Sequence, residues 1–164
     1  MCPERQAKPS PADPAAPTPS MPVETPRRIV QCRGVRGATT VEENSRSAIL
    51  LATGELLWYL IERNGIVPDD VASAYFTTTR DLDAEFPALA ARKLGWLDVA
   101  LICGHEMEVP GALSQCIRVL LHWNTTRTAK EIEHVYIRGA RDLRPDQQAL
   151  LELPDVPIPR FDLD

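Results

Sequence analysis

The 164-residue chain has few aromatic side chains, nine in all, and none of them occurs before Trp58. The first 28 residues contain eight of the fifteen prolines. A segment with no aromatic residue and little apolar area cannot bury enough surface to offset the entropy of ordering it. We therefore expect a disordered, Pro/Ala-rich extension over residues 1–28, and a folded part that begins after it.

Positive charge and long hydrophobic runs are also scarce. Lysine occurs only three times, and the 18 basic side chains are outnumbered by 23 acidic ones, which gives a net charge of −5. Such a chain lacks the basic surface with which proteins bind nucleic acid. No apolar run approaches the roughly 18–20 residues of a membrane span, and the N-terminus lacks the apolar stretch of a secretory signal. The sequence thus predicts a soluble, cytoplasmic protein that binds neither nucleic acid nor membrane.

Motifs for metal ions and phosphate-bearing cofactors are missing as well. The four cysteines are Cys2, Cys32, Cys103 and Cys116, and they form no CxxC pair and have no histidine at zinc-site spacing. Cys103 and Cys116 lie in apolar runs, where a thiol behaves as a small hydrophobic side chain. The chain has no GxGxxG, P-loop or HExxH sequence. We expect reduced cysteines, no metal and no cofactor.

Between residues 29 and 146 the apolar pattern alternates between the period of a strand and that of a helix. It predicts strands over 29–36, 71–79, 97–103, 114–123 and 134–138, helices over 40–64 and 87–94, and a helical turn over 128–133. Thr40 and Glu43 fit the capping box that begins a helix, and Gly65 fits a left-handed helix end. The segment 114–123 fits either pattern, but its Ile, Val and Trp content favours a strand.

This order of elements predicts an α+β (α/β-like) fold with a mixed β-sheet covered by helices on one face. Because one face of the sheet stays uncovered, we expect the chain to form an oligomer. The folded domain is predicted to span 29–146. Residues 147–164 contain three further prolines and are predicted to form a partly ordered C-terminal tail.

Arginine is abundant, with 15 copies, and two of them lie in or beside predicted strands. Arg118 lies inside the apolar run Cys116-Ile-Arg-Val-Leu-Leu, and Arg36 ends the first predicted strand. An arginine in an apolar strand is rarely buried without a partner. Arg118 therefore either alternates outward to water or is held in a pocket against an anion.

Glu106 lies in a loop directly after a predicted strand, which is a common place for functional groups. It is either a solvated loop carboxylate or the counter-charge to these arginines. No Ser or Cys nucleophile lies beside a base, and we interpret His122 and His134 as core or edge residues. Arginines without a nucleophile suit the binding of a small polyanion without covalent catalysis.

Six segments of the chain stand out as a set: residues 33–40 (RGVRGATT), 81–88 (DLDAEFPA), 103–107 (CGHEM), 116–119 (CIRV), 134–136 (HVY) and 143–146 (LRPD). They resemble the signature segments of the monofunctional AroH-class chorismate mutases. The segments occur in the order and at the spacing of the family. The resemblance implies a homotrimer whose sheets pack as a pseudo-α/β barrel, with three active sites between subunits. It also implies the pericyclic rearrangement of chorismate to prephenate, which leads to phenylalanine and tyrosine.

The resemblance further implies roles for eight residues. As catalytic residues, Arg118 would donate to the ether oxygen of chorismate, and Glu106 would balance positive character on the ring. Residues implied to bind the substrate are Arg36 and Tyr136, which would hold the side-chain carboxylate, and Phe86, Arg92, Cys103 and Arg144, which would line or close the pocket. One departure is Leu89, where some relatives carry lysine. Its effect should fall on substrate attraction rather than on chemistry.

Two alternatives come from other classes. One is a trimeric imine deaminase of the RutC-like kind, which also uses an arginine at a subunit interface but needs an activated water. The other is a non-catalytic module that senses a metabolite of the aromatic pathway. Loss of chorismate absorbance on adding the protein would distinguish an enzyme from a sensor.

Overall fold

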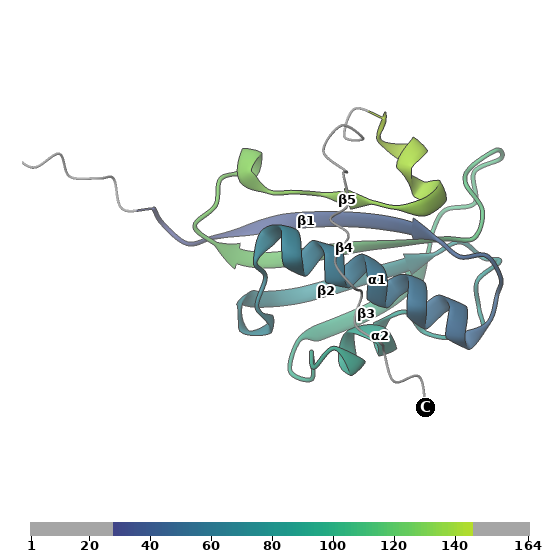
Figure 1. The fold of residues 1–164 in the computed structure, drawn as a ribbon, viewed down its shortest axis with the longest axis horizontal. Helices are drawn as coiled ribbons and strands as arrows, with labels where there is room; N and C mark the ends of the chain where they lie inside the picture. Colours follow the sequence, from purple (N-terminus) through teal and green to yellow (C-terminus); the bar gives the residue numbers. More distant parts are fainter. Residues whose placement is uncertain (1–27, 146–164) are drawn as a thin grey trace, which may run out of the picture.

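The computed structural model describes residues 28–145. The predicted tail over 147–164 and all of the predicted extension except Arg28 lie outside these residues. The described part contains the strands β1 (Gln31–Thr40), β2 (Val71–Thr78), β3 (Ala100–His105), β4 (Cys116–Thr125) and β5 (Val135–Tyr136) and the helices α1 (Arg46–Asn64) and α2 (Ala88–Lys93) (Figure 1). Short 3-10 turns occupy Pro68–Asp70, Ala129–Glu131 and Arg138–Leu143. The predicted order of strands and helices is confirmed.

The strands form one mixed sheet in the order β3-β2-β4-β1-β5. β4 runs antiparallel to both β1 and β2, whereas β2 pairs with β3, and β1 with β5, in parallel. The segment that fitted either helix or strand is β4, the central strand. Its pairing on both sides explains why it is a strand, because a helix would leave the facing edges of β1 and β2 without backbone partners.

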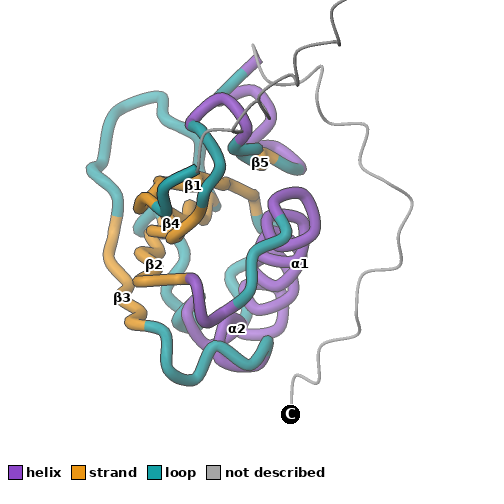
Figure 2. Tube along the Cα trace, turned by 90° about the vertical axis from the view of Figure 1, so that its left-hand side faces the viewer, coloured by secondary structure: helices purple, strands orange, loops and turns teal. Residues whose placement is uncertain are grey.

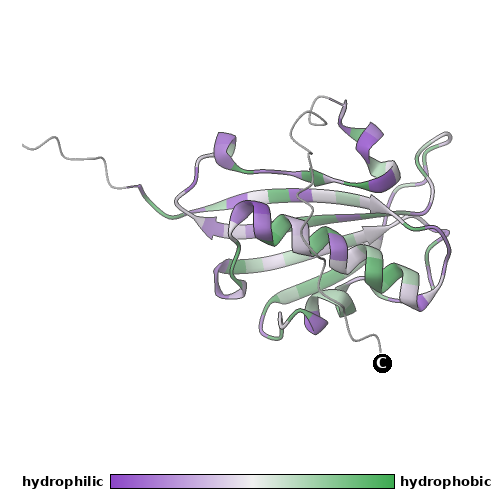
Figure 3. Cartoon of the chain, viewed as in Figure 1, coloured by the Kyte–Doolittle hydropathy of each residue, from purple (hydrophilic) through white to green (hydrophobic). Residues whose placement is uncertain are grey.

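Both helices cover the same face of the sheet, as predicted (Figure 2). The main core lies between that face and the helices and includes Val35, Leu56, Phe76, Trp96 and Leu121, each at most 1% exposed. Figure 3 shows strongly hydrophilic residues on the 3-10 turns at either end of β5, while apolar residues run through α1 and the strands. No helix within residues 28–145 is long and apolar enough to cross a membrane.

The start of α1 differs from the prediction. Thr40 is the last residue of β1, paired with Cys116 of β4, and the helix N-cap is Ser45, whose hydroxyl accepts from the Ala48 N–H at 3.3 Å. The predicted capping box at Thr40 is wrong because the ladder with β4 continues through that residue. The predicted helix end is confirmed, since Gly65 has a φ of 64°.

The alternation of side chains along β4 decides which residues face outward. Ile117, Val119 and Leu121 are at most 3% exposed and pack in the core beneath the helices. Because successive strand residues point to opposite faces, Arg118 and Leu120 face the uncovered side of the sheet. The uncovered side is called the open face below.

Candidate functional site

A cleft of about 380 Å³ lies on the open face of the sheet. Five of the eight predicted site residues line it, namely Arg36, Glu106, Arg118, Tyr136 and Arg144. The remaining lining consists of Gly37, Tyr75, Thr77, Val119, Leu120 and Leu143. The volume falls within the range of about 300–1,000 Å³ that is usual for small-molecule sites.

Arg118 lies in the middle of this cleft because it belongs to the central strand. Its backbone pairs with Ala38 on one side and with Thr77 on the other. One guanidinium nitrogen, Nη1, lies 2.8 Å from Oε2 of Glu106. The two side chains are 32% and 28% exposed, so the ion pair is largely withdrawn from solvent. The sequence left two positions for the Arg118 side chain, facing water or held in a pocket against an anion. The structure places it in a pocket, where the anion is a carboxylate of the same chain.

Glu106 follows the last residue of β3, and its position is fixed by the neighbouring strand. Its backbone N–H donates to the carbonyl of Thr78 at 2.9 Å, which continues the β2–β3 pairing by one residue. One carboxylate oxygen accepts from the Thr77 hydroxyl and the other meets Arg118. Glu106 is therefore a positioned carboxylate in the cleft rather than a solvated loop residue.

Arg36 and Tyr136 lie on the neighbouring strands β1 and β5. The Arg36 side chain is exposed on the open face, and its backbone N–H donates to Nδ1 of His134 at 3.1 Å. Burial lowers the pKa of His134, and the charges of Arg36 and Arg144 lower it further. His134 thus favours the neutral form, whose unprotonated Nδ1 can accept this hydrogen bond.

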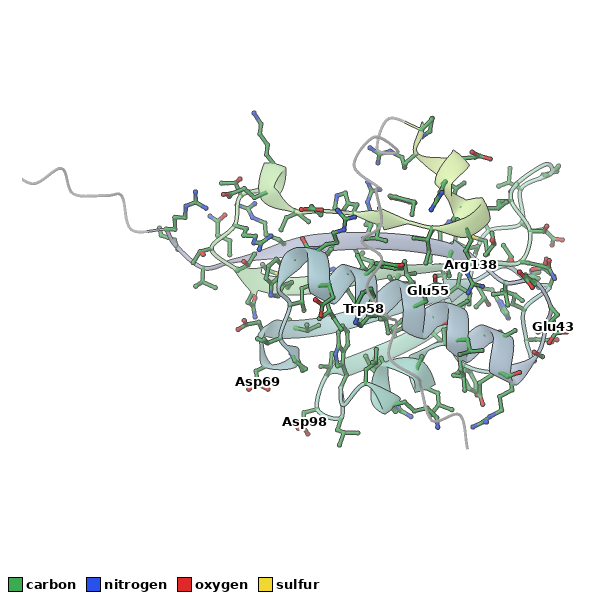
Figure 4. All side chains as sticks on the ribbon, in the orientation of Figure 1. Glu43, Glu55, Trp58, Asp69, Asp98 and Arg138 are labelled. Carbon is green, nitrogen blue, oxygen red and sulfur yellow. The ribbon has the colours of Figure 1, made fainter. Side chains whose placement is uncertain are left out.

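The segment that carries Arg144 is tied to the rest of the domain. Arg138 has a φ of 53°, which is uncommon for a residue other than glycine, and its guanidinium lies 2.6 Å from the Glu55 carboxylate of α1 (Figure 4). The N–H of Gly139 donates to the Thr40 hydroxyl at 3.0 Å. These contacts anchor the start of the 3-10 turn that leads to Arg144 at the rim of the cleft.

The other three predicted residues do not join this cleft within one chain. Phe86, Arg92 and Cys103 line a second hollow of about 430 Å³ at the α2 side of the sheet, together with Leu89. Phe86 is 70% exposed. Burial raises the pKa of the Cys103 thiol, an effect reduced by a hydrogen bond with the Ala88 backbone and by the charge of Arg92. The eight residues therefore form two groups, five in the cleft and three in the hollow.

Thr77 and Tyr75 line the cleft and were not predicted as site residues. They alternate with the core residues Ala74 and Phe76 along β2, a pattern that identifies an outward face but not what lies across from it. Gly104 was not predicted as a site residue either, but it affects the shape of the cleft. A Cβ there would lie 2.8 Å from the Tyr75 hydroxyl, so the absence of a side chain makes room for the tyrosine.

Chemically, the cleft combines three arginines, two tyrosines, a threonine and one carboxylate. Convergent guanidinium groups bind carboxylates through charge-assisted hydrogen bonds. Within residues 28–145, no cluster of three or more His, Cys, Asp or Glu side chains is placed to hold a metal ion. The arrangement suits a small ligand with more than one negative charge.

A family model, the sequences of known proteins and a solved structure all identify the same family. The family described as "Chorismate mutase type I" matches residues 32–147. "Chorismate mutase AroH" of Thermus thermophilus is 48% identical over 118 residues, covering 71% of this chain and 97% of the relative. The protein of the same name from Bacillus subtilis (strain 168) is 45% identical over 115 residues, covering 70% and 91%.

Among solved structures, a chorismate mutase from Clostridium thermocellum superposes with a TM-score of 0.66 at 49% identity, over 67% of this chain and 98% of that one. None of these matches supports the imine deaminase or the sensing module. The family match covers well over half of the chain and includes all eight predicted site residues. The chain therefore belongs to the chorismate mutase type I family.

Proposed function

We propose that this chain rearranges chorismate to prephenate in the cleft of the open face, with Arg118 and Glu106 as its catalytic residues. The observation that carries this proposal is the Arg118–Glu106 ion pair in a cleft with two further arginines. Prephenate leads to phenylalanine and tyrosine, so the reaction belongs to aromatic amino-acid biosynthesis.

The reaction fits a cleft without a nucleophile. Chorismate is a dicarboxylate whose rearrangement breaks one C–O bond and forms one C–C bond within the same molecule. No proton is transferred, and no covalent intermediate forms with the protein. The protein has to hold the compact conformer in which the reacting carbons meet, and to place fixed charge against the charge that develops.

Arg118 can act on the ether oxygen without leaving Glu106. A guanidinium has five N–H donors in a rigid, planar arrangement, and the Glu106 contact is made through Nη1. Donors remain for the ether oxygen, on which negative charge gathers as the C–O bond breaks. Glu106, held from both sides, would then balance the positive character of the ring.

Arg36, Tyr136 and Arg144 surround the cleft at positions suited to hold the carboxylates. Arg36 and Tyr136 lie on neighbouring strands and would bind the side-chain carboxylate. Arg144 follows the anchored 3-10 turn and would close the cleft from the rim. The three arginines of the cleft carry as many positive charges as the two carboxylates of chorismate and Glu106 carry negative ones, so the formal charges within one chain cancel.

The proposed enzyme is a homotrimer in which each cleft is completed by the hollow of a neighbouring subunit. Support comes from the separation of Phe86, Arg92 and Cys103 from the cleft, and from exposed apolar side chains nearby. Phe86 is 70% exposed and Ile102 60%, and both line the hollow. Exposed apolar groups that lie together in this way mark interaction surfaces.

The reaction is tested by following the loss of chorismate absorbance with purified protein and identifying prephenate as the product. A protein that leaves chorismate unchanged refutes the proposed function. Subunit completion is tested by unfolding and refolding equal amounts of Arg118→Ala and Arg92→Ala together. If the residues act from different subunits, random assortment should leave about a quarter of the sites intact and restore activity. A mixture no more active than its components would refute shared sites.

A further inference from the structure

We propose that Thr77 is a positioning residue, which holds the Glu106 carboxylate in the orientation that meets Arg118. This inference rests on the proposed function, in which Glu106 and Arg118 act on the substrate. Thr77 lines the cleft, and its hydroxyl is engaged by the Glu106 carboxylate. Its role would be exerted through Glu106.

The sheet places Thr77 between the two charged residues. On β2 it pairs with Arg118 of β4 on one side and with Gly104 of β3 on the other, two residues before Glu106. Thr77 is 9% exposed, and its hydroxyl donates to Oε1 of Glu106. Arg118 meets the other oxygen, Oε2, at 2.8 Å. Each carboxylate oxygen therefore has its own partner, and the two partners come from adjacent strands.

The Thr77 hydroxyl can fix the orientation of Glu106 when the ion pair alone cannot. During the reaction Arg118 must also donate to the ether oxygen, so its guanidinium is shared between Glu106 and the substrate. The Thr77 hydroxyl belongs to an inner strand of the sheet and is not shared in this way. A β-branched side chain has a restricted χ1, which makes Thr77 a stiff donor. Support of this kind from a strand keeps a catalytic group within the narrow geometry that it needs.

The three consecutive threonines of this segment have different partners, which isolates the role of Thr77. The Thr78 hydroxyl donates to the Leu82 carbonyl at 3.2 Å and lies 3.1 Å from Nδ1 of His105. The Thr79 hydroxyl accepts from the N–H of Cys116 at 2.9 Å. Only the first of the three hydroxyls contacts a charged residue of the cleft. Thr78 is also buried, at 5% exposed against 9% for Thr77, and makes a matched control.

The test compares Thr77→Val, which removes the hydroxyl but keeps the shape, with Thr77→Ser, which keeps the hydroxyl, and with Thr78→Val. Losing a hydrogen bond to a charged group should lower kcat roughly 10–100-fold in Thr77→Val. KM should change much less, since the substrate-binding arginines are untouched. Thr77→Ser should restore most of kcat. Thr78→Val should lose thermal stability but keep its kcat, which separates a structural effect from a positioning effect.

A second comparison asks whether Thr77 acts through Glu106. The Glu106→Ala variant has a low residual turnover, which is measured at high enzyme concentration. Adding Thr77→Val to this variant should lower kcat no further. Losses that multiply in the double variant, or a Thr77→Val enzyme with more than half of the wild-type kcat, would overturn the inference. A wild-type protein without turnover would overturn the proposed function and this role together, whereas an active wild type with an unaffected Thr77→Val variant would overturn only the role of Thr77.

Discussion

Replacing Arg118 by alanine should abolish most of the turnover while leaving the domain folded. The guanidinium lies 2.8 Å from Glu106 in a site where both side chains are about 70% withdrawn from solvent, and it is held on the central strand. Removing one fixed donor to a developing charge typically costs about 3–4 kcal/mol, or 10²–10³-fold in kcat. Because this donor carries a full charge, we expect a loss of at least ~10³-fold.

The effect on stability should be much smaller. Arg118→Ala leaves Glu106 with the Thr77 hydroxyl as its hydrogen-bond donor and with access to water at 28% exposure. Partly exposed ion pairs are worth about 0–1 kcal/mol, because solvent screens the charge that remains. A loss of about 1 kcal/mol lowers Tm by roughly 4 °C in a domain of this size. Activity and stability can therefore be measured on the same folded variant.

Two further variants separate charge from shape. Arg118→Lys keeps a positive charge but loses the planar fork and some reach, so it should recover only part of kcat. Citrulline at position 118 keeps the shape without the charge and should be far slower than arginine. The assay is steady-state kcat and KM for chorismate, with Tm and oligomer mass checked for each variant. If folded Arg118→Ala kept more than about a tenth of the wild-type kcat, the role assigned to Arg118 would be wrong.

Three other outcomes are expected. Arg36→Ala should raise KM and lower kcat/KM at least about tenfold, because carboxylate anchoring is shared by ground and transition states; an unchanged KM would contradict this. Burial, followed by the charges of Arg36 and Arg144, lowers the folded pKa of His134 below its ordinary 6.5, so its contribution to stability is complete above that pH and is lost as pH falls below it. His134→Gln should therefore flatten the fall of Tm between about pH 7 and 5, and an unaltered slope would exclude His134 as its source. Gly104→Ala places a Cβ 2.8 Å from the Tyr75 hydroxyl, so it should raise KM with little change in Tm. Adding Tyr75→Phe to the same chain should reverse this rise in KM. If KM stayed high, displacement of the tyrosine would not be its cause.

Local chemistry predicted the elements well and their ends less well. Gly65 ends α1 as expected, because a left-handed residue after Asn64 is a local feature. Thr40 and Glu43 also carry a local helix-start pattern, yet β1 continues to Thr40 because β4 pairs with it across more than seventy intervening residues. A ladder of backbone hydrogen bonds to a distant strand outweighed one side-chain cap. Nothing in the local sequence could have shown that.

The site shows the same division between local and distant information. The resemblance identified eight residues, but the pattern of the sequence could not show which of them lie together in one chain. Cys103 and Glu106 are three residues apart at the end of β3, which puts their side chains on opposite faces of the sheet. Cys103 accordingly lies toward α2, and Glu106 lies in the cleft. Thr77 was missed because its partner is set by strand register, which alternation alone does not define.

The two faces of β4 carry very different amounts of free energy, and this explains how the cleft keeps its geometry. Ile117, Val119 and Leu121 are buried beneath the helices, and each such side chain contributes about 1.5–3 kcal/mol on burial. The partly exposed Arg118–Glu106 pair contributes about 0–1 kcal/mol. The apolar face therefore fixes the position and register of the strand, and the charged face follows it. A one-residue slip that moved Arg118 out of the cleft would expose all three aliphatic side chains. Charge substitutions in the cleft should consequently change the rate without moving the strand that carries it.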